Sequence, residues 1–92
     1  MKTMSYRLTG RVQGVGFRAY AVRLARECGV VGWVRNDVDG TLSAEATGTD
    51  AALLSFAAGL RMGPPGARVE TLDAFVLDEV DRSPRTDFAV ED

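Results

Sequence analysis

The stretch Gly10-Arg11-Val12-Gln13-Gly14-Val15-Gly16-Phe17-Arg18 joins two sequence patterns of different period. Before it, apolar and polar residues alternate as in a strand, and from Phe17 the apolar positions recur at helical spacing. The stretch therefore predicts the end of a strand, a loop that contains glycine, and the first turn of a helix.

A loop of this kind is suited to binding an anion. The first N–H groups of a helix have no partner within the helix, and the helix dipole adds partial positive charge there. Gly14 and Gly16 allow the backbone to approach a ligand closely, and the planar guanidinium of Arg18 matches two phosphate oxygens. The stretch predicts an oxyanion site, above all for a phosphoryl group. A tight connection that binds nothing is the alternative interpretation.

Length and composition limit the class of protein. With 92 residues, of which 46% are hydrophobic and 26% charged, the chain is expected to form one soluble domain, residues 1–92. The net charge of −2 argues against a surface that binds nucleic acid. No apolar run approaches the length of about 18 residues that a membrane span requires, and no secretory leader is evident.

Few residues of this sequence are chemically reactive. The chain contains no histidine, which excludes histidine bases, Ser-His triads and phosphohistidine chemistry, and argues against a zinc site. The single cysteine, Cys28, lies on the apolar stripe of the first helix, so we expect a buried structural thiol. One cysteine cannot form an internal disulfide, which fits a cytoplasmic location.

The rest of the chain divides into strand and helix patterns. The helix from Phe17 is expected to end at Gly29, and a second helix begins after the break at Gly48-Thr49-Asp50, with Gly59 weakening its last turn. The other expected elements are strand 4–12, strand 30–36, hairpin turn 37–40, strand 41–47, loop 63–66, strand 69–80 with a bulge near Leu72, turn 81–84, and strand 86–90 with Phe88 and Val90 on one side.

This β-α-β-β-α-β order with a short extra strand predicts an α+β fold, the ferredoxin-like α/β sandwich. Its sheet is expected to be antiparallel with both helices on one face. Its first two strands run in the same direction, so the loop after the first and Asn36 near the end of the second should lie at one edge. There Asn36 can accept a hydrogen bond from water and donate one to an oxyanion. A turn asparagine that prepares the hairpin is the alternative.

Three segments together resemble the acylphosphatase family. They are Gly10-Arg11-Val12-Gln13-Gly14-Val15-Gly16-Phe17-Arg18, Gly32-Trp33-Val34-Arg35-Asn36-Asp37-Val38-Asp39-Gly40 and Gly63-Pro64-Pro65-Gly66-Ala67-Arg68-Val69. The resemblance covers nearly the whole chain, in the right order. The segment 88–92 departs from it, because many relatives finish with a basic or aromatic residue.

The resemblance implies hydrolysis of acyl phosphates to a carboxylate and inorganic phosphate, without a metal or cofactor. It implies that Arg18 binds the phosphoryl group and that Asn36 positions the attacking water. The phosphate site would be completed by the backbone amides of Gln13, Gly14, Val15, Gly16, Phe17 and Arg18. The expected ligands are an acyl phosphate and inorganic phosphate or other anions. We also expect a monomer that binds neither nucleic acid nor a membrane.

Three other interpretations are open. Asp37-Val38-Asp39-Gly40-Thr41 matches the Asp-x-Asp-Gly-Thr motif of the haloacid-dehalogenase phosphatases, but that motif follows a buried parallel strand in a larger domain. A nucleic-acid-binding domain of the same topology needs paired aromatic residues on central strands, for which Tyr6 and Trp33 are weak support. A regulatory module, similar to a domain of larger carbamoyl-transferring hydrogenase-maturation proteins, would bind an anion without turnover.

Overall fold

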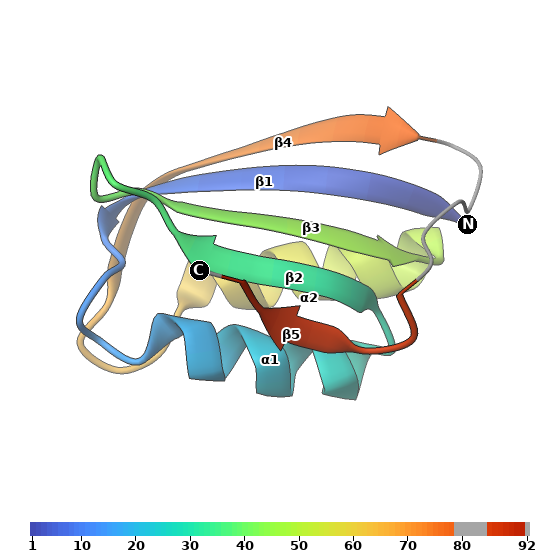
Figure 1. The fold of residues 1–92 in the computed structure, drawn as a ribbon, viewed down its shortest axis with the longest axis horizontal. Helices are drawn as coiled ribbons and strands as arrows, with labels where there is room; N and C mark the ends of the chain where they lie inside the picture. The colour runs from blue at the N-terminus through green and yellow to red at the C-terminus, as the bar shows by residue number, and fades with distance from the viewer. Residues whose placement is uncertain (79–84, 92) are drawn as a thin grey trace.

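The computed structural model describes residues 1–78 and 85–91, and its helices and strands follow the chain in the order expected (Figure 1). They are β1 (Lys2–Arg11), α1 (Phe17–Cys28), β2 (Val31–Asn36), β3 (Leu42–Gly48), α2 (Asp50–Met62), β4 (Arg68–Asp78) and β5 (Phe88–Val90). The predicted turn at 81–84 lies outside the described residues.

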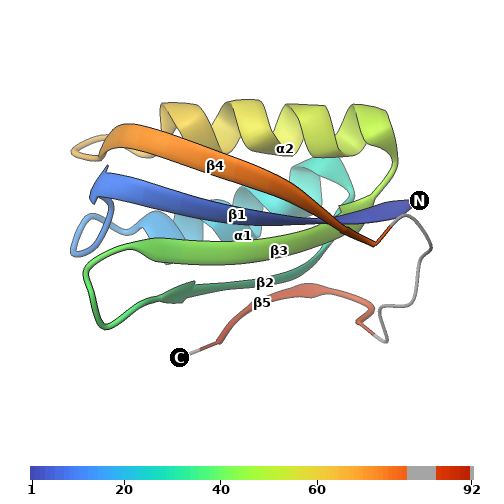
Figure 2. The ribbon, with the colours of Figure 1, turned by 90° about the horizontal axis from the view of Figure 1, so that it is seen from above.

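The strands form one sheet in the order β4-β1-β3-β2-β5, which Figure 2 shows from above. The neighbours among β4, β1, β3 and β2 are antiparallel, and both helices cover the same face of the sheet (Figure 1). The predicted ferredoxin-like sandwich is confirmed. The short extra strand departs from the antiparallel sheet that the sequence predicts, because β5 pairs in parallel with β2, with Val34 opposite Val90. The strand β4 runs opposite to both β2 and β5, so β5 is parallel to β2.

The core lies between the sheet and the two helices. Tyr6 and Leu8 of β1 are buried on either side of exposed Arg7, as the period of two predicts. From α2, Phe56 places its ring centroid 5.6 Å from that of Tyr6 and 5.4 Å from that of Phe88 in edge-to-face contacts. Phe88 is fully buried, so this single residue joins the short edge strand to the core.

The end of α1 and the start of α2 lie at the residues that the sequence predicts for them. Gly29 ends α1, and its N–H donates to the Ala25 carbonyl at 2.9 Å. Thr49 begins α2, because its hydroxyl accepts a hydrogen bond from the Ala52 N–H at 3.1 Å. In the described part of the chain, neither helix is long and apolar enough to cross a membrane.

The pairing of β1 with β4 contains the bulge expected near Leu72. Leu8 lies directly opposite Leu72, and the register shifts just beyond it, between Thr9 and Gly10, where Glu70 is the extra residue of β4. A second shift, which was not predicted, lies between Thr3 and Met4. A bulge is defined by the partner strand, and the partner of β4 lies at the other end of the sequence.

Gly59 has a packing role that its helix propensity does not reveal. The helix α2 continues past it to Met62, and the Gly63 N–H donates to the Gly59 carbonyl at 3.0 Å. A Cβ at position 59 would lie 2.5 Å from both methyl carbons of Leu24 on α1. The hydroxyl of Tyr20 on α1 donates to the same carbonyl at 2.7 Å. The two helices therefore meet closely where α2 has no side chain.

We expect Gly59→Ala to lower the free energy of unfolding by about 1–2 kcal/mol, although alanine is the better helix former by about 1 kcal/mol. The new methyl group would displace Leu24. Urea denaturation measures the effect, and Leu24→Ala in the same chain should reverse its sign by making room. The matched control is Ala58→Gly on the exposed side of α2, which reports propensity alone. A stabilised Gly59→Ala protein with Leu24 intact would contradict the packing role.

Candidate active site

The loop between β1 and α1 lies at the edge of the sheet where β2 and β5 also end (Figure 1). Gly14 and Gly16 take φ values of 73° and 78°, in the left-handed region that glycine adopts without strain. Gly16 precedes α1 directly, no side chain caps this described helix end, and its first turn contains no acidic residue. The first N–H groups of α1 can therefore bind an anion, which the helix dipole also favours.

A pocket of about 310 Å³ opens beside this loop. Of the predicted site residues, it brings together Gly14, Gly16, Phe17, Arg18 and Asn36. The described residues that line it are Val12, Gly14, Gly16, Phe17, Arg18, Ala19, Asn36 and Val90. The loop between β1 and α1 and the end of β2, which the sequence predicts to lie at one edge of the sheet, thus line the same cavity.

Asn36, the last residue of β2, carries an unusual buried atom. Its Oδ1 is inaccessible to solvent and has no hydrogen-bond partner among the described residues. Buried polar atoms are almost always satisfied in folded proteins, so the unpaired oxygen sets Asn36 apart from an asparagine that serves only to hold its own turn. A turn asparagine would bond to its own hairpin, and Oδ1 makes no such bond within the described chain.

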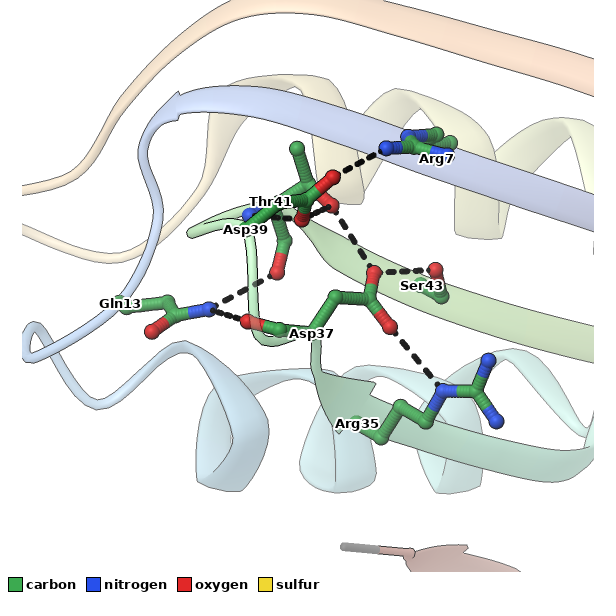
Figure 3. Close-up of polar contacts among 7 residues, drawn as sticks. All are labelled: Arg7, Gln13, Arg35, Asp37, Asp39, Thr41 and Ser43. Carbon is green, nitrogen blue, oxygen red and sulfur yellow. Dashed lines mark hydrogen bonds and ion pairs between the residues drawn. The ribbon is translucent and has the colours of Figure 1, made fainter.

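Gln13 and Val15 belong to the predicted loop but are not among the residues that line the pocket. Gln13 Nε2 donates to the carbonyls of Asp37 at 2.8 Å and Thr41 at 2.9 Å (Figure 3). Val15 packs against the core with part of its surface exposed. The side chain of Gln13 therefore ties the loop to the hairpin that follows Asn36. Binding of phosphate by the backbone amides of these two residues stays a prediction.

The hairpin between β2 and β3 is held by two aspartates (Figure 3). The carboxylate of Asp37 accepts hydrogen bonds from Arg35 at 3.0 Å, Thr41 at 2.9 Å and Ser43 at 2.5 Å. Asp39 forms an ion pair with Arg7 of β1 at 2.5 Å. A haloacid-dehalogenase nucleophile would end a buried strand of a larger parallel sheet, whereas these aspartates occupy an antiparallel hairpin. The Asp-x-Asp-Gly-Thr match is therefore a turn sequence here.

The hairpin should weaken in acid. Burial alone would raise the pKa of Asp37, but hydrogen bonds from Ser43, Arg35 and Thr41 and the charge of Arg35 outweigh it and lower that pKa below its ordinary 3.8. A carboxyl with a depressed pKa in the folded state contributes stability above its unfolded pKa and loses it as the pH falls through the folded value.

We therefore expect Asp37→Asn to lower the free energy of unfolding by about 2 kcal/mol at neutral pH. The difference from the original protein should shrink as the pH falls below 3.8. Denaturation at a series of pH values tests this, with Asp73→Asn on exposed β4 as a control that removes a carboxylate outside the hairpin. A difference that is constant with pH would show that the charge of Asp37 is not what holds the turn.

Three of the residues that line the pocket, Val12, Ala19 and Val90, were not predicted as site residues. Val12 and Ala19 flank the loop, so proximity alone could have suggested them. Val90 belongs to β5. The sequence pattern that bore on its position was the alternation that placed it on the same side of the strand as Phe88. In the structure Phe88 is fully buried while Val90 is 43% exposed and borders the cavity.

Fold and pocket together define a class: a small α+β sandwich with a glycine-containing loop, an arginine and an asparagine around one pocket. A model of the family described as acylphosphatase matches residues 4–90, nearly the whole chain. The chain belongs to the acylphosphatase family, as the three sequence segments indicated.

Individual relatives agree with this family. The acylphosphatase of Salinibacter ruber is 50% identical over 80 residues, which cover 87% of this chain and 84% of that protein. Among solved structures, the acylphosphatase from Bacillus subtilis superposes with a TM-score of 0.93 at 29% identity, over 100% of both chains. An acylphosphatase from Coxiella burnetii gives 0.88 at 28% identity, covering 98% of this chain and 92% of that one. The chain is accordingly a hydrolase of this family.

Proposed function

We propose that this protein hydrolyses the carboxyl-phosphate bond of acyl phosphates, giving a carboxylate and inorganic phosphate. The observation that carries the proposal is the shared pocket, whose lining includes Arg18, the two glycines of the loop and Asn36. The names of the family and of its relatives support the same chemistry.

In the proposed mechanism the phosphoryl group lies in the loop between β1 and α1. Backbone N–H groups of the Gln13–Arg18 loop and the guanidinium of Arg18 bind its non-bridging oxygens. Phosphoryl transfer requires mainly positioning and stabilisation of the charge on these oxygens, which such donors supply. Arg18 presents several N–H groups in one plane and can bind two oxygens at once.

Asn36 positions the nucleophile in this proposal. When the Asn36 side chain turns toward the pocket, its Oδ1 accepts a hydrogen bond from a water molecule and its Nδ2 donates to a phosphoryl oxygen. The water oxygen forms a bond to phosphorus as the bond from phosphorus to the acyl oxygen breaks, and the electron pair leaves with the carboxylate. One proton of the water passes to a non-bridging phosphoryl oxygen, so that the products are the carboxylate and dihydrogen phosphate. A carboxylate departs without protonation, so the reaction needs no general acid, consistent with a chain without histidine.

The decisive experiment is hydrolysis of benzoyl phosphate in excess EDTA. We expect turnover that EDTA does not change, because the proposal uses only side chains and backbone amides. Loss of turnover in EDTA would indicate a metal-dependent reaction. Binding of inorganic phosphate by the folded protein without any turnover would favour a regulatory anion-binding module.

We further propose that the protein acts as a cytoplasmic monomer and binds no nucleic acid. Its single cysteine and net charge of −2 support these assignments. Light scattering after gel filtration measures the mass in solution, and a dimer would contradict the monomer.

A further inference from the structure

The pocket beside the loop is lined by two chemically different kinds of residue. Gly14, Gly16, Arg18 and Asn36 carry N–H groups that can bind oxygen atoms. The other residues of the lining, Val12, Phe17, Ala19 and Val90, have apolar side chains. A ligand that contacts both kinds of residue needs an anionic end and an apolar end joined closely together, since the cavity of about 310 Å³ is small for a ligand site.

The distribution of charge restricts the apolar end further. Among the described residues that line the pocket, Arg18 alone is charged, and in the proposed function it binds the phosphoryl group. Beyond Val90, the carboxylate of Glu91 forms an ion pair with Arg85. A second anionic group on the ligand would therefore lie against apolar side chains, where burial of a charge is unfavourable.

Val90 is held firmly in its place at the pocket. The Gly32 N–H donates to the Asp87 carbonyl at 3.0 Å, and the Glu91 N–H donates to the Val34 carbonyl at 2.8 Å, one on each side of Val90. The side chain of Asp87 binds two nitrogens of Arg26 on α1, at 3.3 and 3.1 Å. Together with buried Phe88, these contacts fix β5 against both β2 and α1.

We infer that Val90, together with Ala19, forms the binding surface for the acyl group and selects acyl phosphates whose acyl group is small, uncharged and apolar. This inference rests on the proposed function and adds the class of substrate to it. Acyl phosphates that carry a second anionic group are poor substrates, because the described lining offers their second charge no cation.

The test compares crotonyl phosphate with fumaryl phosphate, two rigid trans acyl phosphates in which a methyl group is replaced by a carboxylate. Each enzymatic kcat/KM is divided by the spontaneous hydrolysis rate in the same buffer, which removes differences in intrinsic reactivity. We expect the protein to prefer crotonyl phosphate by about tenfold. Val90→Lys should reduce that preference about fivefold, the effect of one partly exposed ion pair.

Leu54→Lys is the matched control, because Leu54 is exposed on α2, does not line this pocket and gives the same change in net charge. Val90→Ala tests the apolar contact without charge. It should lower kcat/KM for crotonyl phosphate about threefold and leave inhibition by inorganic phosphate unchanged. Val90 is 43% exposed, so both substitutions are compatible with folding, which circular dichroism checks.

Equal use of the two substrates by the original protein would overturn the inference, as would equal shifts in Val90→Lys and Leu54→Lys. Failure of the proposed function itself is a different result, since the folded protein would then hydrolyse neither substrate. Retained preference in the Leu54→Lys protein together with its loss in Val90→Lys would establish the surface.

Discussion

Replacement of Arg18 by alanine is expected to abolish detectable binding of inorganic phosphate and to lower kcat/KM for benzoyl phosphate by a factor of about 10³ or more. Arg18 is the charged residue among the described groups that line the pocket, and it lies in the first turn of α1 beside the loop. Loss of one preorganised donor typically costs a hydrolase about 10² to 10³ in rate. A guanidinium that binds two phosphoryl oxygens contributes charge as well as hydrogen bonds.

Two variants make this result specific. Arg23→Ala removes another exposed arginine of α1 that does not line the pocket, so activity should be unchanged. Arg18→Lys keeps the charge but loses the planar fork, so we expect partial recovery of phosphate binding and an intermediate rate. Titration calorimetry with phosphate and steady-state kinetics measure the two effects. Full activity of Arg18→Ala would remove Arg18 from the mechanism.

Replacement of Asn36 by alanine is expected to lower kcat by a factor of about 10² to 10³ while KM and phosphate binding change little. The reason is that Asn36 is proposed to hold the attacking water, an interaction that matters in the transition state more than in the ground state. A raised KM with an unchanged kcat would show instead that Asn36 binds substrate and does not position water.

Stability measurements separate this role from a structural one. The buried Oδ1 of Asn36 has no hydrogen-bond partner among the described residues, so its removal should leave the free energy of unfolding within about 0.5 kcal/mol of the original. Replacement of a residue that holds the hairpin together would lower both the activity and the free energy of unfolding. The Asp37→Asn protein provides that comparison, because Asp37 bonds within the hairpin and does not line the pocket.

The sequence predicted the fold well where local signals decide it. The strand, glycine loop and helix around positions 10–18 require only alternation, glycine and helical spacing, and the structure has each of them. Gly29 and Thr49 set helix ends through backbone geometry and a side-chain cap, both of which act within a few residues. Asn36 was placed beside the loop by topology alone, and the pocket contains both.

Local sequence patterns could not predict the contacts that join residues far apart along the chain. The side chain of Gln13 bonds to the hairpin 24 and 28 residues away, and Arg7 pairs with Asp39 across 32 residues. The second bulge of β4, opposite the start of β1, depends on the pairing of these two strands. Val90 borders the pocket only because β5 joins the sheet in parallel beside β2, and residues 86–90 contain no signal for that neighbour.

The strand order has a consequence for the kinetics of folding. The strand β1 lies between β3 and β4 in the sheet, and neither is its neighbour along the chain. Leu8, for example, pairs with Leu42 on one side and Leu72 on the other, so long segments must close before β1 gains a partner. Chains dominated by such contacts cross a high entropic barrier and fold in about milliseconds to seconds. Because the loop between β1 and α1 continues directly from β1, catalytic activity in a refolding experiment should return only with this slow assembly of the sheet.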